Sequence, residues 1–401
     1  MYKKLIFRYW AVLCILLETF VVIQGYMNVP DFAVLLSIVA VGFFFYPRAF
    51  FNLPTLFFIL FVSLMLIVIQ IKSYDVQFFR VIFIYWLFSL SLINVFLYNK
   101  DWKGLKIVLI VGMLILFIST IFSIIYSGSQ PDLVRQYVLY SSEQDEAGVK
   151  LGQRLGIANY GMIHGIPTLL PLFVYLFKKE KTLFLKILWL LLIAIFYYLI
   201  IVSGFGTALI LSTLILIASV LVSDNKRKNL LLFGILILIG ILFINKEFII
   251  NSLDWVKGYF VDSAIYDKIV DIQYSIQTND FEGQLNTRGN LYADSWNTFY
   301  KYPIIGSPYQ SDAGGHLFIA DFLAWFGIVG TLPLILFFYY SFRRIYLIIE
   351  NHQKIYYVLA LLPFIILSFV KAVPFFEQVL YLLVFIPAVF LLKKDTVKDI
   401  S

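Results

Sequence analysis

The chain alternates between long apolar runs and shorter polar connections along most of its length. A helix needs about 20 largely apolar residues to cross the hydrocarbon core of a bilayer. The runs that approach this length lie near residues 9–25, 32–47, 54–72, 78–98, 105–127, 159–177, 182–202, 205–223, 230–246, 317–341, 355–371 and 375–392. The pattern predicts an all-α fold, a polytopic membrane protein of about twelve transmembrane helices. We expect residues 1–401 to form a single transmembrane domain, with the first run as an uncleaved span because no small-residue cleavage site follows it.

Basic residues gather in every second connection between these runs, which indicates the orientation of the chain. The clusters are Lys3, Lys4 and Arg8; Arg48; Lys100, Lys103 and Lys106; Lys178, Lys179, Lys181 and Lys186; Lys226, Arg227 and Lys228; Arg343, Arg344 and Lys354; and Lys393, Lys394 and Lys398. Short basic connections stay in the cytoplasm, so both termini are predicted to be cytoplasmic. The long polar connections 128–158 and 247–316 then lie on the outer face. The second, between spans nine and ten, is too long for a mere connector and is expected to be functional.

Composition agrees with a membrane location and narrows the function. The chain is 61% hydrophobic and only 14% charged, which is too apolar for a soluble domain. Its net charge of +7 comes from the short basic clusters, so it indicates topology and not nucleic-acid binding. Cys14 is the only cysteine, which excludes an intramolecular disulfide and a cysteine metal site. Phosphate-binding loops, dinucleotide fingerprints, zinc spacings and serine elbows are absent from the sequence, so we expect neither a metal nor a cofactor.

Two arginines of the outer connections stand closest to apolar segments. Arg154 precedes the sixth run, and Arg288 opens a predicted helix that ends before Pro303. A guanidinium is a planar, permanently charged fork that fits phosphate oxygens, so this pair is suited to a lipid-linked diphosphate. The alternative is that each arginine only reaches the lipid headgroups or pairs with a loop carboxylate.

His316 is the candidate general base because it stands where the long outer connection enters the tenth run. An imidazole can take a proton from a sugar hydroxyl near neutral pH. Gly314 and Gly315 before it would allow close approach of backbone and substrate. The alternative is that His316 is an amphipathic anchor at the membrane interface.

Other polar residues near the outer face are candidates for substrate contacts or for structural pairs. His164 could be a second polar contact, and an aromatic stripe containing Tyr292 and Trp296 could stack on sugar rings or dock the outer loop. Lys371 and Glu377 are expected to pair with each other as structural residues. Asp321 lies five residues after His316, which on a helix turns it away by about 140° and makes it a poor direct partner for the imidazole.

Three stretches resemble the O-antigen polymerase and ligase superfamily of bacterial polysaccharide assembly. "RLGIANYGMIHG" is similar to an outer-loop element of the family through Arg154, Gly156 and Asn159. "TRGNLYADSWNTFYKYPIIGSPYQ" is similar to its arginine helix, and "GGHLFIADFLAWFGIVG" to its histidine motif. Family members often carry Ser-Arg where this chain has "VSGFGTALI", so the resemblance leaves Arg135 or Lys150 as a replacement for a third cationic contact.

This resemblance implies a fold like that of the GT-C-type lipid-linked glycosyltransferases and a bacterial plasma-membrane location. Its substrate would be an oligosaccharide on undecaprenyl diphosphate, with Arg154 and Arg288 on the diphosphate and His316 as the base. Arg135, Asn159, His164, Tyr292 and Trp296 are candidate substrate contacts.

The leading hypothesis is a metal-independent polymerase of capsule, O-antigen or exopolysaccharide repeat units. It would work among membrane lipids with the chain-length regulator and flippase of its pathway. The alternatives are a ligase that moves finished glycan to another acceptor, and a flippase. A flippase needs cations within the spans and no long outer loop, whereas here the spans are poor in arginine.

Overall fold

The computed structural model describes residues 2–19, 31–74, 76–129, 146–223, 284–315, 317–371 and 376–391, with scattered residues between 250 and 273. Within these ranges every regular element is helical. The prediction for residues 230–246 lies outside them, and each of the other predicted runs overlaps a helix.

Six helices of the described chain are long and apolar enough to cross a membrane. They are α4 (Leu53–Lys72), α6 (Trp102–Ser129), α9 (Tyr160–Lys179), α10 (Leu183–Val202), α16 (Phe318–Ile348) and α17 (Asn351–Val370). Shorter apolar segments lie in α3 (Asp31–Phe45), in α5 (Val76–Asn99), in α11 (Gly206–Leu221) and in the helical stretch α18 (Phe376–Leu380), η3 (Tyr381–Phe385) and α19 (Ile386–Leu391). The helices α1 (Tyr2–Thr19), α8 (Glu146–Arg154) and α15 (Gln284–Lys301), with the short turns η1 (Pro47–Phe50) and η2 (Gln310–Asp312), complete this part of the chain. The chain is therefore an all-helical, polytopic membrane protein.

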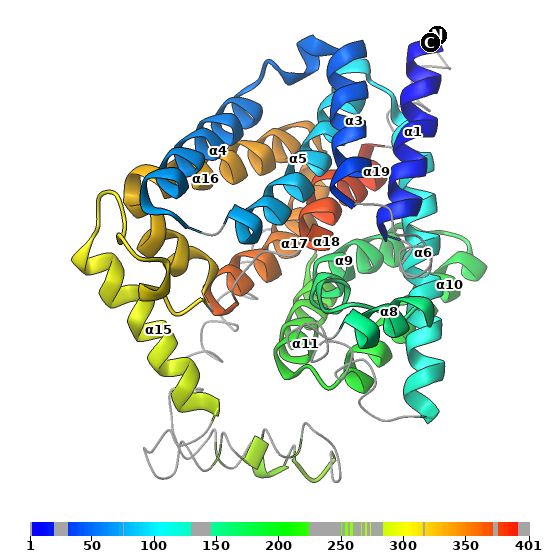
Figure 1. Cartoon of the computed structure of the whole chain (residues 1–401). Coiled ribbons are helices and arrows are strands. Elements are labelled where there is room, and N and C mark those ends of the chain that lie inside the picture. The colour runs from blue at the N-terminus through cyan, green and yellow to red at the C-terminus, as the bar shows by residue number, and fades with distance from the viewer. Residues whose placement is uncertain are drawn as a thin grey trace.

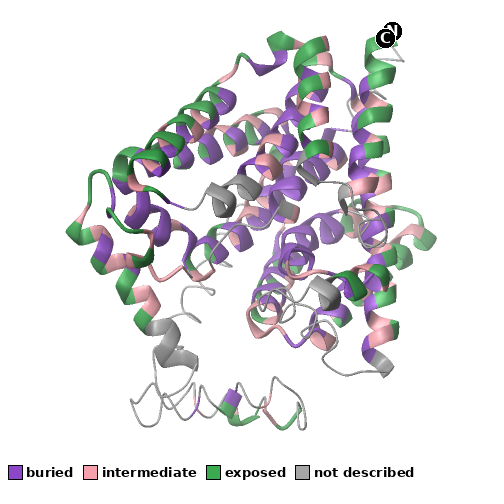
Figure 2. Cartoon of the chain, in the orientation of Figure 1, coloured by how far each residue is buried: buried purple, intermediate pink, exposed green. Residues whose placement is uncertain are grey.

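The helices pack around α9 and the last helical stretch (Figure 1). α9 contacts α10, α11 and α17, while α4 runs along α16 and α1 packs on α3 and α6. Most of α9 and nearly all of residues 378–391 are buried, whereas α4 and α10 expose many large apolar side chains (Figure 2). Apolar exposure on outer helices is what contact with lipid requires.

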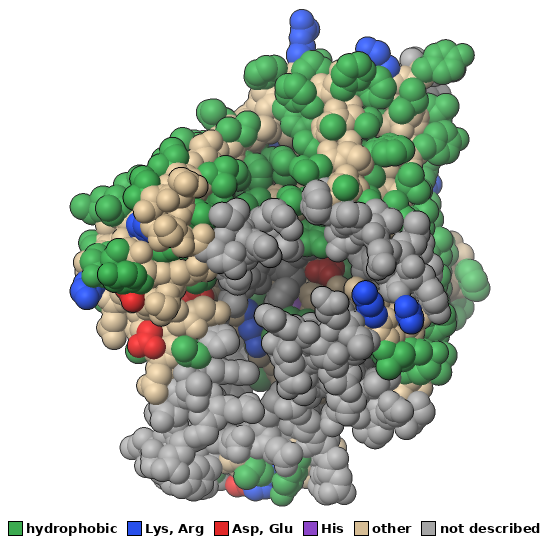
Figure 3. Space-filling view, in the orientation of Figure 1, with side chains coloured by type: hydrophobic (Ala, Val, Ile, Leu, Met, Phe, Trp, Pro, Cys, Tyr) green, Lys and Arg blue, Asp and Glu red, His purple; other side chains and the backbone are tan. Residues whose placement is uncertain are grey.

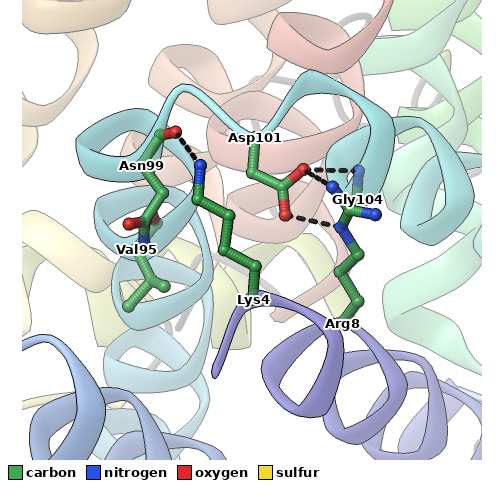
Figure 4. A network of polar contacts seen from close by, with 6 residues as sticks. All are labelled: Lys4, Arg8, Val95, Asn99, Asp101 and Gly104. Carbon is green, nitrogen blue, oxygen red and sulfur yellow. Dashed lines mark hydrogen bonds and ion pairs between the residues drawn. The ribbon is translucent and has the colours of Figure 1, made fainter. Parts of the chain in front are cut away.

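At one end of the bundle the N-terminal basic cluster contacts the connection between α5 and α6, and the sequence analysis assigns both to the cytoplasm. Arg8 Nε donates to Asp101 Oδ2 at 2.7 Å, and Lys4 Nζ donates to the Asn99 carbonyl at 3.0 Å (Figure 4). Asp101 also caps α6, because its carboxylate accepts from Gly104 N at 3.1 Å. These contacts fix the start of α1 against the connection between α5 and α6.

α16 is broken at Gly327, whose φ of 61° and ψ of −169° are not helical. A broken helix frees backbone groups, and in hydrocarbon these groups need internal partners. The segment after α15 supplies them, since Ile328 N and Val329 N donate to the carbonyls of Pro303 at 2.9 Å and Ile304 at 3.1 Å. The predicted apolar run 317–341 is thus two helical pieces that meet at Gly327, where the segment after α15 accepts the freed backbone hydrogen bonds.

Side chains from the C-terminal end of α4 hold this junction. Lys72 Nζ donates to the Ile305 carbonyl at 2.7 Å and to the Trp325 carbonyl at 3.1 Å. Tyr74 donates its hydroxyl to the carbonyl of Ser307. Both contacts join connections that the sequence analysis assigns to the outer face, and they fix the loop after α15 against α4 and α16.

Candidate functional site

One face of α15 carries the residues that attach this helix to the bundle. The Tyr292 hydroxyl donates to the Val370 carbonyl at 3.3 Å, and Ser295 is fully buried against α16. Helix positions four and seven residues apart share a face, so position 288 lies on the same face as these two. The side chain of Arg288 is outside the described residues. For Tyr292 the contact favours a docking role.

The buried carboxylate of Asp321 holds the loop that precedes α16. Its Oδ1 accepts from Ser295 Oγ at 2.5 Å and from Gly315 N at 3.2 Å, and its Oδ2 accepts from Leu317 N at 2.8 Å. Gly315 and Leu317 are the neighbours of His316, which itself lies outside the described residues. The carboxylate therefore fixes the backbone on both sides of the candidate base.

Gly314 and Gly315, before His316, are each favoured as glycine for a different structural reason. Gly314 touches the backbone of α15: a Cβ added there would lie 2.1 Å from the Leu291 carbonyl oxygen. Its N–H also donates to Ser295 Oγ at 2.9 Å. Gly315 has a left-handed φ of +74°, and nothing lies within 4 Å of the place a Cβ would take. We expected these glycines to let the backbone approach the substrate. Gly314 instead lets the loop approach α15, while the space beside Gly315 is open.

The structure also shows why the helical spacing argument about Asp321 fails. Leu317 is the N-cap residue and α16 begins at Phe318, so position 316 precedes the helix. The angle of 140° applies only between two residues of one helix. Asp321 lies in the first turns of α16, and its carboxylate reaches back to the preceding loop.

A second polar group lies at the start of α9. Asn159 caps this helix by accepting from Met162 N at 2.7 Å, and the Glu377 carboxylate of α18 lies beside its side chain. That carboxylate lies directly over Gly161, where a Cβ would meet Glu377 Oε2 at 2.1 Å. A carboxylate beside a helix N-terminus is favourably placed.

Lys371 lies between the two groups. Its carbonyl accepts from Phe318 N at 2.6 Å, next to the Asp321 network. Its ammonium lies 5.7 Å from the centre of the Tyr160 ring, and that ring lies 4.1 Å from the imidazole of the buried His164. We expected Lys371 to pair with Glu377; the contacts found are the Tyr160 ring for Lys371 and the start of α9 for Glu377.

The remaining candidates are placed only in part. Arg154 is exposed at the end of α8, five residues before the Asn159 cap, and Lys150 is exposed on the same helix. Trp296 is half-buried, with its ring centre 6.3 Å from that of Tyr300. Arg135 is outside the described residues. The convergence of Arg154, Arg288 and His316 therefore remains a prediction.

The space-filling view shows that acidic and basic side chains both appear on this face of the molecule, among residues that the structure does not describe (Figure 3).

No protein-family model matches the sequence, and no curated protein matches it.

Proposed function

We propose that the chain is a membrane glycosyltransferase that joins undecaprenyl-diphosphate-linked oligosaccharide repeat units into a surface polysaccharide. In this proposal it has about twelve spans and a GT-C-like arrangement, and it works on the outer face of the bacterial plasma membrane with both termini in the cytoplasm. Its polytopic, all-helical fold supports this function.

The bracing of the loop around His316 is the observation that carries the proposal. A general base must be held within hydrogen-bond reach of the proton that it takes. Asp321 bonds to the backbone before and after position 316, and Ser295 ties the same loop to the helix that contains Arg288. Such a scaffold fits a reacting histidine better than a lipid anchor, because an anchor needs no fixed backbone geometry.

The proposed reaction displaces a diphosphate. His316 takes the proton of an acceptor hydroxyl while the hydroxyl oxygen attacks the anomeric carbon of the donor sugar. The bond from that carbon to the diphosphate oxygen breaks, and undecaprenyl diphosphate leaves with the electron pair. Arg154 and Arg288 offset the developing negative charge, which such a leaving group needs more than it needs a proton. The base then returns its proton to solvent, and no metal ion is required.

The group at the start of α9 supports the binding of sugar hydroxyls beside this centre. Asn159, Glu377 and Lys371 offer an amide, a carboxylate and an ammonium within one region of the bundle. These groups can donate to and accept from hydroxyls. Asn159 and His164 are accordingly candidates for acceptor contacts.

A strain that lacks the gene, complemented with His316→Ala or Arg288→Ala, tests the proposal. A lost polymerase leaves single repeat units on the surface or on the carrier lipid. A lost ligase leaves long chains on the carrier, and a lost flippase traps units inside. His352→Ala is the matched control, because His352 lies in the first turn of α17, where its Nε2 is hydrogen-bonded to the Tyr175 hydroxyl at 3.1 Å, at the end of the bundle that the sequence analysis assigns to the cytoplasm. Full-length surface polysaccharide from both test variants would refute the proposed site.

A further inference from the structure

We infer that Asp321, together with Ser295, is a positioning pair that sets the place of His316 for proton transfer. The inference rests on the proposed function, because the pair acts only through the residue proposed as the base. Asp321 and Ser295 are both fully buried, so neither side chain reaches the substrate. Their effect passes through the backbone of the loop.

The two oxygens of the carboxylate have separate tasks. Oδ1 accepts from Ser295 Oγ and from Gly315 N, and Oδ2 accepts from Leu317 N. One rigid, planar group thus sets the distance between the peptide units on either side of position 316. A side-chain amide has a single acceptor oxygen, so Asp321→Asn would turn an NH₂ group toward one of these donors. Only a carboxylate satisfies both sides of the loop.

Ser295 connects this loop to α15. Its Oγ donates to Asp321 and accepts from Gly314 N at 2.9 Å. Positions 288 and 295 are seven residues apart on one helix, which is about 10 Å along the axis and on one face. The loop and α15 therefore form one unit, which carries the proposed base and one of the proposed diphosphate ligands. The hydrogen bonds of Ser295 to Asp321 and Gly314 hold this unit together.

This arrangement predicts a specific kinetic signature. A residue that binds substrate changes KM when it is removed, whereas a residue that positions the base changes kcat. A displacement of about 1 Å can cost about a hundredfold in rate. For Asp321→Asn we expect kcat per folded molecule to fall by about 10- to 100-fold, with KM for the lipid-linked unit within about twofold of wild type.

The experiment uses the full-length chain in lipid vesicles with a lipid-linked oligosaccharide unit as the probe. kcat and KM are measured for wild type, Asp321→Asn and Asp312→Asn, with the folded fraction taken from thermal unfolding. Asp312→Asn is the matched control, because Asp312 belongs to the same loop and accepts from Ser307 but lies four residues away from position 316. It is expected to leave kcat within about twofold. If Asp321→Asn does not fold, Ser295→Ala is measured for the same loss of kcat.

The outcomes separate the inference from the proposed function. If the wild-type chain forms no polymer, the proposed function fails and this inference fails with it. If the wild-type chain forms polymer and His316→Ala does not, an unchanged kcat or a raised KM for Asp321→Asn overturns only the positioning role. In the His316→Ala background, Asp321→Asn should lower the residual rate no further. If Asp321→Asn lowered the rate by the same factor with and without His316, the positioning role would also be overturned.

Discussion

Gly314→Ala is the substitution whose effect the structure determines most closely. The added Cβ would lie 2.1 Å from the carbonyl oxygen, 2.6 Å from the carbonyl carbon and 2.7 Å from the Cα of Leu291. All three are backbone atoms of α15, so no side chain can rotate away to make room. The loop itself has to move.

The required movement follows from the contact distance. Ordinary contact begins at 3.4 Å, so the loop must retreat by 3.4 − 2.1 = 1.3 Å. The bonds from Gly314 N to Ser295 at 2.9 Å and from Gly315 N to Asp321 at 3.2 Å would then exceed hydrogen-bond length. Two such bonds contribute about 1–3 kcal/mol to stability. A base displaced by more than 1 Å is expected to lose about a hundredfold in rate.

The assay is polymer formation by purified protein, with thermal unfolding measured on the same samples. Gly206→Ala is the control, because Gly206 opens α11, has no left-handed φ and has nothing within 4 Å of an added Cβ. It should match wild type in both measurements. If Gly314→Ala polymerises within about twofold of wild type, the loop geometry proposed for the base is refuted.

Substitutions at three further positions test the scaffold, each by thermal unfolding in detergent. Lys72→Met should lower the free energy of unfolding by about 2–4 kcal/mol, because the carbonyls of Ile305 and Trp325, beside the break in α16, lose a charged donor. An unchanged melting temperature would contradict this stabilising role of Lys72. Asp101→Ala should cost about 1–3 kcal/mol through the lost cap of α6 and the lost partner of Arg8, whose side chain is 24% exposed, and Asp101→Asn should cost less. Burial, with a smaller contribution from Asp312, raises the pKa of Tyr74 from its ordinary value of 10 to about 12. The raised pKa contributes stability that is complete below pH 10 and is lost as the pH approaches 12, so wild type should lose stability there more steeply than Tyr74→Phe.

The positions of the helices could be read from the sequence because an apolar run of about 20 residues is a strong local signal. The predicted runs 54–72 and 182–202 match α4 and α10 within one residue at each end. The break in α16 was missed, because hydropathy does not report φ and Gly327 lies in an otherwise apolar run. Its backbone partners come from residues 303 and 304, more than 20 positions earlier.

The contacts around the candidate site residues could not be predicted from the sequence. The predicted run 159–177 begins at Asn159, one residue before α9, and the structure shows Asn159 as the N-cap of that helix, a position that asparagine favours. Its contact with Glu377 joins positions over 200 residues apart, and no local pattern reports such a pairing. Asp321 was judged a poor direct partner of His316 because the helical angle was applied to position 316, which precedes α16. The burial of Ser295 has no local sequence signal.

The most direct test of the central claim is the length of glycan made by the purified chain in vesicles that contain only lipid-linked repeat units. The account predicts a ladder of products that grows by one repeat unit at a time on the carrier lipid, without added metal ion or nucleotide. It also predicts that His316→Ala reduces this ladder to single units while His352→Ala leaves it intact. A ladder of unchanged length from His316→Ala, or no ladder from the wild-type chain, would contradict the account.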